Sequence, residues 1–183
     1  MKRLLAAGAL VLAGLVPAAA QQPAADPHNT VYLDTKDGRI TIRLRPDLAP
    51  KHVEQIKALT KQGFYNGVPF HRVIEGFMAQ TGDPTGTGTG KSDLPNIPAE
   101  FTKTPYKKGS VGMARSQDPN SANSQFFICY EGCGPLTGQY TLFGEVVSGM
   151  DVAEKIKKGN PAANGMVSSP DKIVKMQLAT DAK

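Results

Sequence analysis

Residues 70–83 bring a cation, an amide and apolar side chains into one short stretch of extended chain. Side chains two positions apart in a β-strand lie on the same face, so Met78 and Gln80 share a face beyond the break at Gly76. Arg72 shares a face with Ile74 on the strand before the break, so a guanidinium and an amide can stand together next to an apolar surface. Arginine stays protonated and presents a rigid fork of donors, so such a surface can hold an apolar group against a fixed cation.

The same residues also have a purely structural interpretation. Most phenylalanine and methionine side chains pack in the protein core, and this applies to Phe77, Met78 and Phe127. Arg72 can form an ordinary surface salt bridge. The residue pattern alone leaves both interpretations open.

The elements that position these residues are mostly short strands. Nineteen glycines and 14 prolines in 183 residues indicate many turns. Asp37-Gly38 lies between two alternating apolar and polar runs, which is a strong hairpin signal. Apolar residues recur at helical spacing after Pro50. The patterns predict strands over 30–35, 39–45, 70–74, 78–81, 110–115, 125–130, 141–147 and 172–180, and helices over 50–62 and 151–158.

These elements predict a mostly β fold of one domain. Short strands joined by turns leave exposed edges unless the sheet closes on itself. We therefore expect a closed eight-stranded antiparallel β-barrel with two α-helices covering its ends.

Residues 86–92 suggest a phosphate-binding loop at first sight. That motif needs a glycine where this chain has Thr85, so the spacing does not fit. We interpret the segment as a mobile loop.

Cys129 and Cys133 are separated by three residues, one more than in thioredoxin-type motifs. On one continuous strand their Cα atoms would lie about 13 Å apart, too far for a disulfide. A tight turn through Glu131 and Gly132 would bring them together. A disulfide and a buried cysteine with a separate loop thiol both remain possible.

Residues 1–20 have the layout of a secretory signal peptide. Lys2 and Arg3 precede an apolar stretch that Pro17 ends, and small residues lead up to Ala20. The apolar stretch is shorter than the roughly 20 residues that span a bilayer, which disfavours the alternative of an uncleaved anchor. We expect cleavage after Ala20.

The rest of the chain is then a flexible leader, residues 21–29, and one domain over 30–183. The short, alanine-rich signal is typical of bacteria, so we expect a periplasmic protein. The formal charge of +5 is scattered, which gives no case for nucleic acid or a membrane surface as a partner. Three histidines and two cysteines leave little room for a metal cluster, and we expect no metal and no cofactor.

Two blocks of the sequence resemble the cyclophilins, which are peptidyl-prolyl cis–trans isomerases. Residues 70–83 read FHRVIEGFMAQTGD, and residues 124–129 read SQFFIC. They occur in cyclophilin order and at near cyclophilin spacing, and the resemblance extends from about residue 31 to residue 178. It implies that Arg72 is the catalytic arginine and that Gln80 binds the substrate backbone and orients the arginine.

The resemblance also implies an apolar pocket for the proline ring and a neighbouring groove for the preceding side chain. Ala114 matches a residue of that groove, and His71 is expected to pack beneath its strand as a structural residue. The implied substrate-binding residues are Phe77, Met78, Ala114, Phe127, Leu136 and Tyr140.

The sequence departs from the common eukaryotic pattern at three places. Pro135 stands where a tryptophan is frequent, so we expect only weak cyclosporin binding. Tyr140 replaces a histidine, as in many bacterial relatives, and keeps an aromatic body with a polar tip. Residues 115–123 align only with a one-residue insertion, so the resemblance assigns no preference for the residue before proline.

The resemblance implies an isomerase that accelerates X-Pro isomerisation during the folding of exported proteins. Its partners would be proline-containing polypeptides, and we expect a monomer. Two alternatives are a module that binds proline-containing peptides without turnover, and a carrier of small molecules in a barrel interior. A barrel of this size usually fills its interior with side chains, which disfavours the carrier.

Overall fold

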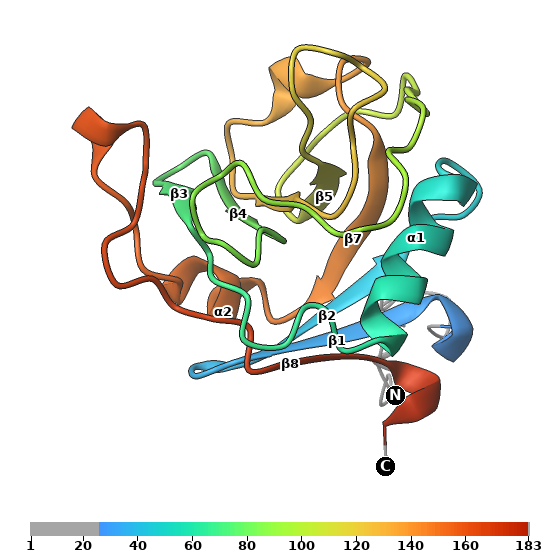
Figure 1. Cartoon of the computed structure of the whole chain (residues 1–183), viewed down its shortest axis with the longest axis horizontal. Coiled ribbons are helices and arrows are strands. Elements are labelled where there is room, and N and C mark those ends of the chain that lie inside the picture. Colours follow the sequence, from blue (N-terminus) through green and yellow to red (C-terminus); the bar gives the residue numbers. More distant parts are fainter. Residues whose placement is uncertain (1–25, 183) are drawn as a thin grey trace, which may run out of the picture.

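The structure, a computed structural model, describes residues 26–182, so the predicted signal peptide and most of the predicted leader lie outside it. The described chain holds the eight strands and two α-helices that the sequence predicts, in the predicted order (Figure 1). The strands are β1 (Thr30–Thr35), β2 (Gly38–Leu44), β3 (Arg72–Ile74), β4 (Met78–Thr81), β5 (Ser110–Met113), β6 (Phe126–Cys129), β7 (Leu142–Ser148) and β8 (Lys175–Leu178). The helices are α1 (Pro50–Lys61) and α2 (Met150–Lys155), with short 3-10 helices η1 (Pro27–Asn29), η2 (Gly134–Leu136), η3 (Pro161–Ala163) and η4 (Ala179–Asp181).

The strands form one antiparallel sheet in the order β3-β4-β6-β5-β7-β2-β1-β8. This sheet is an open, curled half-barrel, so the prediction of a closed barrel is wrong. Its two edge strands are not paired as strands within residues 26–182. An isolated bridge between Pro69 and Lys172 links the segments that precede them, together with flanking backbone hydrogen bonds such as the one from the N–H of Phe70 to the carbonyl of Asp171 (2.9 Å).

The outer edge of β3 cannot pair with β8 because a loop already occupies it. Val73 donates its backbone N–H to the carbonyl of Gly165 (2.8 Å), and the carbonyl of Val73 accepts from the N–H of Gly159 (2.9 Å). On the other edge, the N–H of Met176 donates to the side chain of Asn66 (2.9 Å). Both edges are thus covered locally, which protects them without closing the sheet.

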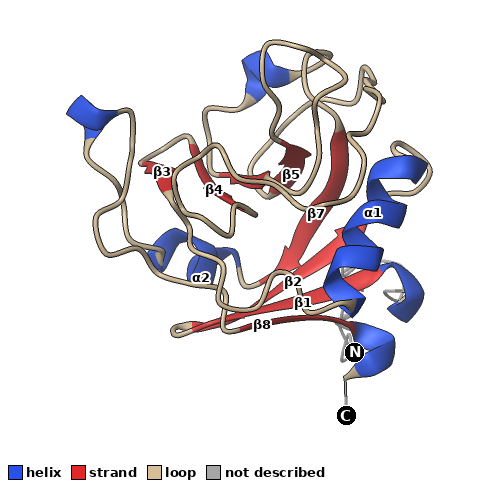
Figure 2. Ribbon diagram, in the orientation of Figure 1, coloured by secondary structure: helices blue, strands red, loops and turns tan. Residues whose placement is uncertain are grey.

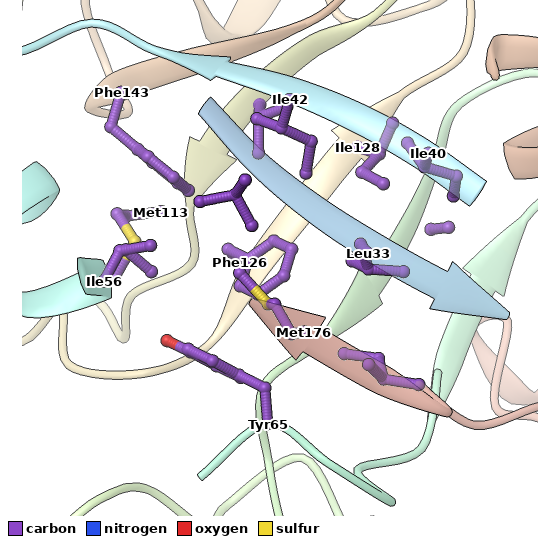
Figure 3. Close-up of a cluster of buried hydrophobic side chains, with 14 of the residues drawn as sticks. Leu33, Ile40, Ile42, Ile56, Tyr65, Met113, Phe126, Ile128, Phe143 and Met176 are labelled. Carbon is purple, nitrogen blue, oxygen red and sulfur yellow. The ribbon is translucent and has the colours of Figure 1, made fainter. Parts of the chain in front are cut away.

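The main hydrophobic core lies on one face of this sheet (Figure 3). Val53, Ile56 and Leu59 of α1 are buried in it, as the helical spacing predicts. Helix α1 packs against β7 and β8, and α2 packs against β2. Long loops join β4 to β5 and β5 to β6, as the tan segments of Figure 2 show. These loops are the part of the fold that shapes the functional face.

Some element ends differ from the predicted ones. Helix α2 ends at Lys155 because Ile156, with φ of −53° and ψ of 131°, leaves the helical conformation, so the predicted last turn does not form. Strand β8 begins only at Lys175. The predicted hairpin at Asp37-Gly38 forms, with Thr35 paired to Gly38.

Candidate active site

The functional face begins with a row of residues that crosses three neighbouring strands. Arg72 of β3 lies directly opposite Gln80 of β4, and Gln80 lies opposite Phe127 of β6. Directly opposed residues of antiparallel strands present their side chains on the same face. The strand pairing therefore confirms that the arginine, the glutamine and an aromatic ring share one surface.

The guanidinium of Arg72 is held by neutral acceptors. Its Nη1 donates to Oε1 of Gln80 (3.2 Å), its Nε donates to the backbone carbonyl of Asn164 (3.0 Å), and its Nη2 donates to Oδ1 of Asn164 (3.0 Å). Within residues 26–182 it forms no salt bridge, so the structural interpretation of Arg72 does not hold. Partial burial lowers the pKa of Arg72 from its ordinary value. An arginine nevertheless remains protonated at neutral pH.

A second amide fixes the orientation of Gln80. The Nε2 of Gln80 donates to Oε1 of Gln125 (2.9 Å). The Nε2 of Gln125 in turn donates to the carbonyls of Gly88 (3.0 Å) and Gly90 (2.8 Å). Since each amide group has its donors and acceptors matched along this chain, the oxygen of Gln80 faces Arg72. The loop that resembled a phosphate-binding segment thus supports the arginine through two glutamines.

Asn164 is a site residue that the sequence interpretation missed. It follows η3 in the loop that covers the edge of β3, and it adopts a left-handed backbone conformation with φ of 52°. Asparagine tolerates this conformation better than most residues. Its one sequence signal is the dipeptide Asn164-Gly165, which indicates a turn but says nothing of Arg72, 92 positions earlier in the chain.

The eight predicted site residues all line one cavity of about 190 Å³. Arg72 and Gln80 stand at its polar side, and Arg115 is the one lining residue that was not predicted. The apolar lining residues belong to a second hydrophobic cluster, separate from the main core. That cluster shares with the cavity the side chains of Phe77, Met78, Ala114, Phe127, Leu136 and Tyr140.

Two tyrosine rings fix the position of Phe127. The ring of Tyr106 is stacked with it at a centroid distance of 6.0 Å, and the ring of Tyr140 meets it edge to face at 5.9 Å. A Cβ atom at Gly112, opposite Phe127 in β5, would lie 2.2 Å from the hydroxyl of Tyr106 and 2.6 Å from the ring of Phe127. Glycine is therefore required here by the close approach of the two rings.

Arg115 holds the outer wall of the cavity. Its guanidinium lies over the ring of Tyr140, 4.6 Å from the centroid, and 5.8 Å from that of the exposed Phe101. It also donates to the carbonyls of Ser116 (2.8 Å) and Gln139 (3.0 Å). A cation over an aromatic face is attractive, so Arg115 helps to fix the tyrosine that replaces the family's histidine.

Cys129 and Cys133 form a disulfide, with their Cα atoms 6.0 Å apart. The tight turn that the sequence left as one of two alternatives therefore exists. The N–H of Tyr130 donates to the carbonyl of Phe77 (2.8 Å), so this turn packs directly against the cavity wall. The disulfide joins the end of β6 to η2, which carries Leu136 into the same cavity.

His71 is fully buried beside the arginine. Neither ring nitrogen has a hydrogen-bond partner among the described residues. Burial lowers the pKa of His71, while the negative charge of Asp83 opposes this effect. The cavity lining does not include His71, which fits the expected packing position.

A larger cavity of about 430 Å³ adjoins the first one. The two share Gln80, Ala114 and Arg115 in their walls, so they form one continuous groove. The larger cavity extends over the loop at Gly88 and Gly90. It lies where the resemblance places the groove for the side chain before proline.

Among residues 26–182, no three His, Cys, Asp or Glu side chains gather as ligands for a metal ion. None of the described helices has the length and apolar character that a membrane crossing requires.

The geometry can be compared with known proteins. Residues 30–178 match the sequence profile of the family described as cyclophilin type peptidyl-prolyl cis-trans isomerase/CLD. A probable peptidyl-prolyl cis-trans isomerase of Brucella suis is 58% identical over 171 residues, which cover 87% of this chain and 87% of the relative. A peptidyl-prolyl cis-trans isomerase of Helicobacter pylori is 40% identical over 141 residues, covering 75% of this chain and 85% of the relative.

Solved structures agree with these relatives. A cyclophilin from Hirschia baltica superimposes with a TM-score of 0.76 at 30% identity, covering 87% of this chain and 77% of that one. A cyclophilin-type isomerase of Cryptosporidium parvum, solved in the presence of the dipeptide Ala-Pro, gives a TM-score of 0.74 at 29% identity and covers 81% of this chain and 98% of that one. Fold, sequence and site geometry together place this chain in the cyclophilin family, as a peptidyl-prolyl cis–trans isomerase.

Proposed function

We propose that Arg72 lowers the barrier to rotation about the X-Pro bond by stabilising the twisted transition state. The barrier is about 18–20 kcal/mol because the nitrogen shares its lone pair with the carbonyl. At the twisted geometry the prolyl nitrogen becomes pyramidal and regains this lone pair. A guanidinium aimed at the nitrogen then stabilises the transition state more than the planar ground state.

The observation that carries this proposal is the way Arg72 is held. Its partners Gln80 and Asn164 are neutral, and no carboxylate in the described part of the chain pairs with the charge that faces the cavity. A preorganised donor costs no reorganisation during the reaction. Gln80 orients the arginine and binds the substrate backbone in this proposal. The proline ring occupies the apolar wall of the cavity, against Phe77, Met78, Phe127 and Leu136, with Tyr140 at the rim and Ala114 at the groove.

The first test replaces Arg72 by alanine. We expect kcat/KM on a short Pro peptide to fall by roughly 10²–10³-fold, the loss typical for removal of one preorganised donor. Arg39→Ala is the matched control, since that arginine pairs with Asp34 on the β1–β2 hairpin, outside the cavity. The measurement is exchange spectroscopy of the peptide, which separates faster cis–trans exchange from mere binding. An Arg72→Ala enzyme as fast as the parent contradicts the mechanism.

We also propose that the substrates are exported proteins that fold outside the cytoplasm, in the periplasm of a bacterium. The signal-peptide pattern of residues 1–20 supports this, and so does the Cys129–Cys133 disulfide, because disulfides persist mainly in oxidising compartments. The scattered charge supports a partner other than nucleic acid or a membrane surface. We further propose a monomer that binds cyclosporin weakly, since Pro135 removes an aromatic wall.

Export has a direct test. We expect the protein isolated from the periplasm of a bacterial host to begin at Gln21, with the mass of the chain after cleavage at Ala20. Intact-mass spectrometry of the separated cell fractions measures this. A chain that keeps Met1 and stays in the cytoplasm rules the periplasmic role out, whereas the isomerase mechanism would stand unaffected.

A further inference from the structure

The described arginines fall into two groups. Residues 26–182 contain five of them, and three form salt bridges with carboxylates: Arg39 with Asp34, Arg43 with Glu145, and Arg45 with Asp47. The remaining two, Arg72 and Arg115, form no salt bridge within this range, and both line the proline cavity. The unpaired guanidinium charge is therefore concentrated at the groove.

The adjoining larger cavity adds a third cation. Its wall contains Lys91 together with Arg115, and the Nζ of Lys91 donates to Oδ1 of Asn96 (3.1 Å), a neutral group. Among residues 26–182, no aspartate or glutamate lines either cavity. The two cavities together thus carry three cations, at Arg72, Lys91 and Arg115, and no carboxylate in their linings.

The one buried carboxylate among residues 26–182, that of Asp83, forms no salt bridge with the cations of this groove. Asp83 is fully buried beneath the loop that borders the larger cavity. Its Oδ1 accepts from the N–H and hydroxyl of Thr85 (both 2.7 Å), and its Oδ2 accepts from the N–H of Gly88 (2.6 Å). Both oxygens are thus turned toward the loop backbone and occupied there.

The guanidinium of Arg115 offers a substrate mainly its positive charge, because most of its N–H groups already donate within the protein. Four of its N–H contacts reach backbone carbonyls, those of Ser116, Gln117 and Gln139. Its guanidinium plane is also held over Tyr140. A substrate carboxylate in the larger cavity would therefore be attracted by the charge of Arg115. The ammonium group of Lys91, in the wall of the same cavity, can in addition donate a hydrogen bond to that carboxylate.

We propose that the larger cavity makes this isomerase select X-Pro segments with an acidic side chain one or two positions before the proline, with Lys91 and Arg115 as the specificity-determining residues. The proposal rests on the proposed function, which places the proline ring beside Arg72. A lysine side chain in the same position would meet three like charges. An acidic side chain would meet opposite charges, and it would not have to displace a carboxylate of the protein from them.

The experiment measures kcat/KM for tetrapeptides that carry Glu, Gln or Lys at either of the two positions before proline. At about 10 mM salt we expect the best Glu peptide to exceed its Lys counterpart by about fivefold, with Gln between them, as partly exposed charge pairs allow. Raising the salt to about 1 M should reduce the ratio toward one because screening then acts within a few ångströms.

Variants assign the effect to the two residues. The ratio of kcat/KM for the Glu peptide to kcat/KM for the Lys peptide should fall by about half or more in Arg115→Gln and in Lys91→Gln, because each variant loses one charge pair. Because the readout is a ratio within one variant, a general loss of activity cancels. Lys61→Gln, on the exposed end of α1, removes the same charge outside both cavity walls and should keep the parent's ratio.

The outcomes separate this proposal from the function on which it rests. A protein with no turnover on any Pro peptide refutes the proposed mechanism. Clear turnover with equal kcat/KM for Glu, Gln and Lys peptides refutes the charge selectivity alone. A Glu preference that survives in both Arg115→Gln and Lys91→Gln, or that Lys61→Gln also removes, refutes the assignment to this cavity.

Discussion

Arg72 acts through its position, since any arginine is protonated at neutral pH. What distinguishes this one is that side-chain and backbone acceptors from two different segments hold the guanidinium in a single orientation. Gln80 lies on the neighbouring strand, and Asn164 lies in the loop that covers the edge of β3. Asn164 is thus a positioning residue, because it contacts the arginine and does not line the cavity.

Asn164→Gly tests this role at the scale of one side chain. Glycine keeps the left-handed backbone and the carbonyl that accepts from Arg72, and removes only the Oδ1 acceptor. We expect kcat to fall by about tenfold with little change in KM, the cost of about one hydrogen bond to a charged group. Steady-state kinetics on a Pro peptide measures the split between kcat and KM.

The matched control for Asn164 is Ser169→Gly. Ser169 has nearly the same left-handed backbone, with φ of 51°, and its side chain makes no hydrogen bond to the site. It should keep the kcat of the parent. A larger rise in KM than loss of kcat in Asn164→Gly would mean that the residue supports binding and does not position the arginine.

Among the elements, α1 depends on a distant carboxylate. Its N-cap, Ala49, has no side-chain hydrogen bond, and the carboxylate of Glu100 accepts from the backbone N–H groups of Lys51 (3.2 Å) and His52 (3.1 Å) instead. The imidazole of His52 also donates from Nδ1 to this carboxylate (2.6 Å). Burial would raise the pKa of Glu100, but these hydrogen bonds lower it overall, so the carboxylate stays ionised at neutral pH.

Glu100→Ala should therefore destabilise the fold by about 2 kcal/mol, since it removes the helix cap and the partner of a buried imidazole. Urea unfolding at pH 7 measures the change. Glu54→Ala, on the exposed face of the same helix, is the control and should stay within about 0.5 kcal/mol of the parent. Since Glu100 lines neither cavity of the groove, kcat/KM of the folded Glu100→Ala variant should match the parent.

At the scale of the whole molecule, two buried histidines make stability depend on pH. Burial lowers the pKa of His52 and of His71 below the ordinary value of 6.5, against the opposing effects of Glu100 and Asp83. Below about pH 6.5 the unfolded chain binds protons that the folded chain does not, so the unfolded state gains stability. Above that pH both states are neutral and the contribution is constant.

We therefore expect the free energy of unfolding to fall between pH 7.5 and pH 5.5, by up to about 1.4 kcal/mol per pH unit for each of the two histidines. Asp83 and Glu100, whose pKa values are lowered from 3.8 and 4.5, stay ionised in this window and lose their contribution only at lower pH. Urea titrations at the two pH values give the difference.

Variants separate the two histidines in this pH test. His71→Gln and His52→Gln should each reduce the difference between the two pH values, whatever their own effect on stability. His28→Gln, at an exposed residue, should retain it. A parent whose stability is the same at both pH values would contradict the lowered pKa of both buried imidazoles.

The sequence by itself determined the strands, their order along the chain and the residues of one strand that share a face. Alternation has a period of two residues, so it places Met78 and Gln80 on one face of β4, whereas the pairing of β3 with β4 brings Arg72 onto that face. The resemblance carried by residues 70–83 and 124–129 then supplied the family and the other predicted cavity residues, but not Arg115. Side-chain alternation and short motifs are local properties of the sequence, so a single segment is enough to recognise them.

The tertiary structure alone decided what depends on segments far apart in the chain. Asn164 reaches Arg72 only because its loop pairs with the edge of β3, and that same pairing leaves the sheet open. Arg115 covers Tyr140, and the Cys129–Cys133 turn closes against Phe77, through contacts that no periodicity encodes. Such contacts depend on how the whole chain packs. The backbone N–H and C=O groups at a sheet edge need hydrogen-bond partners, and the completed fold decides which segment supplies them.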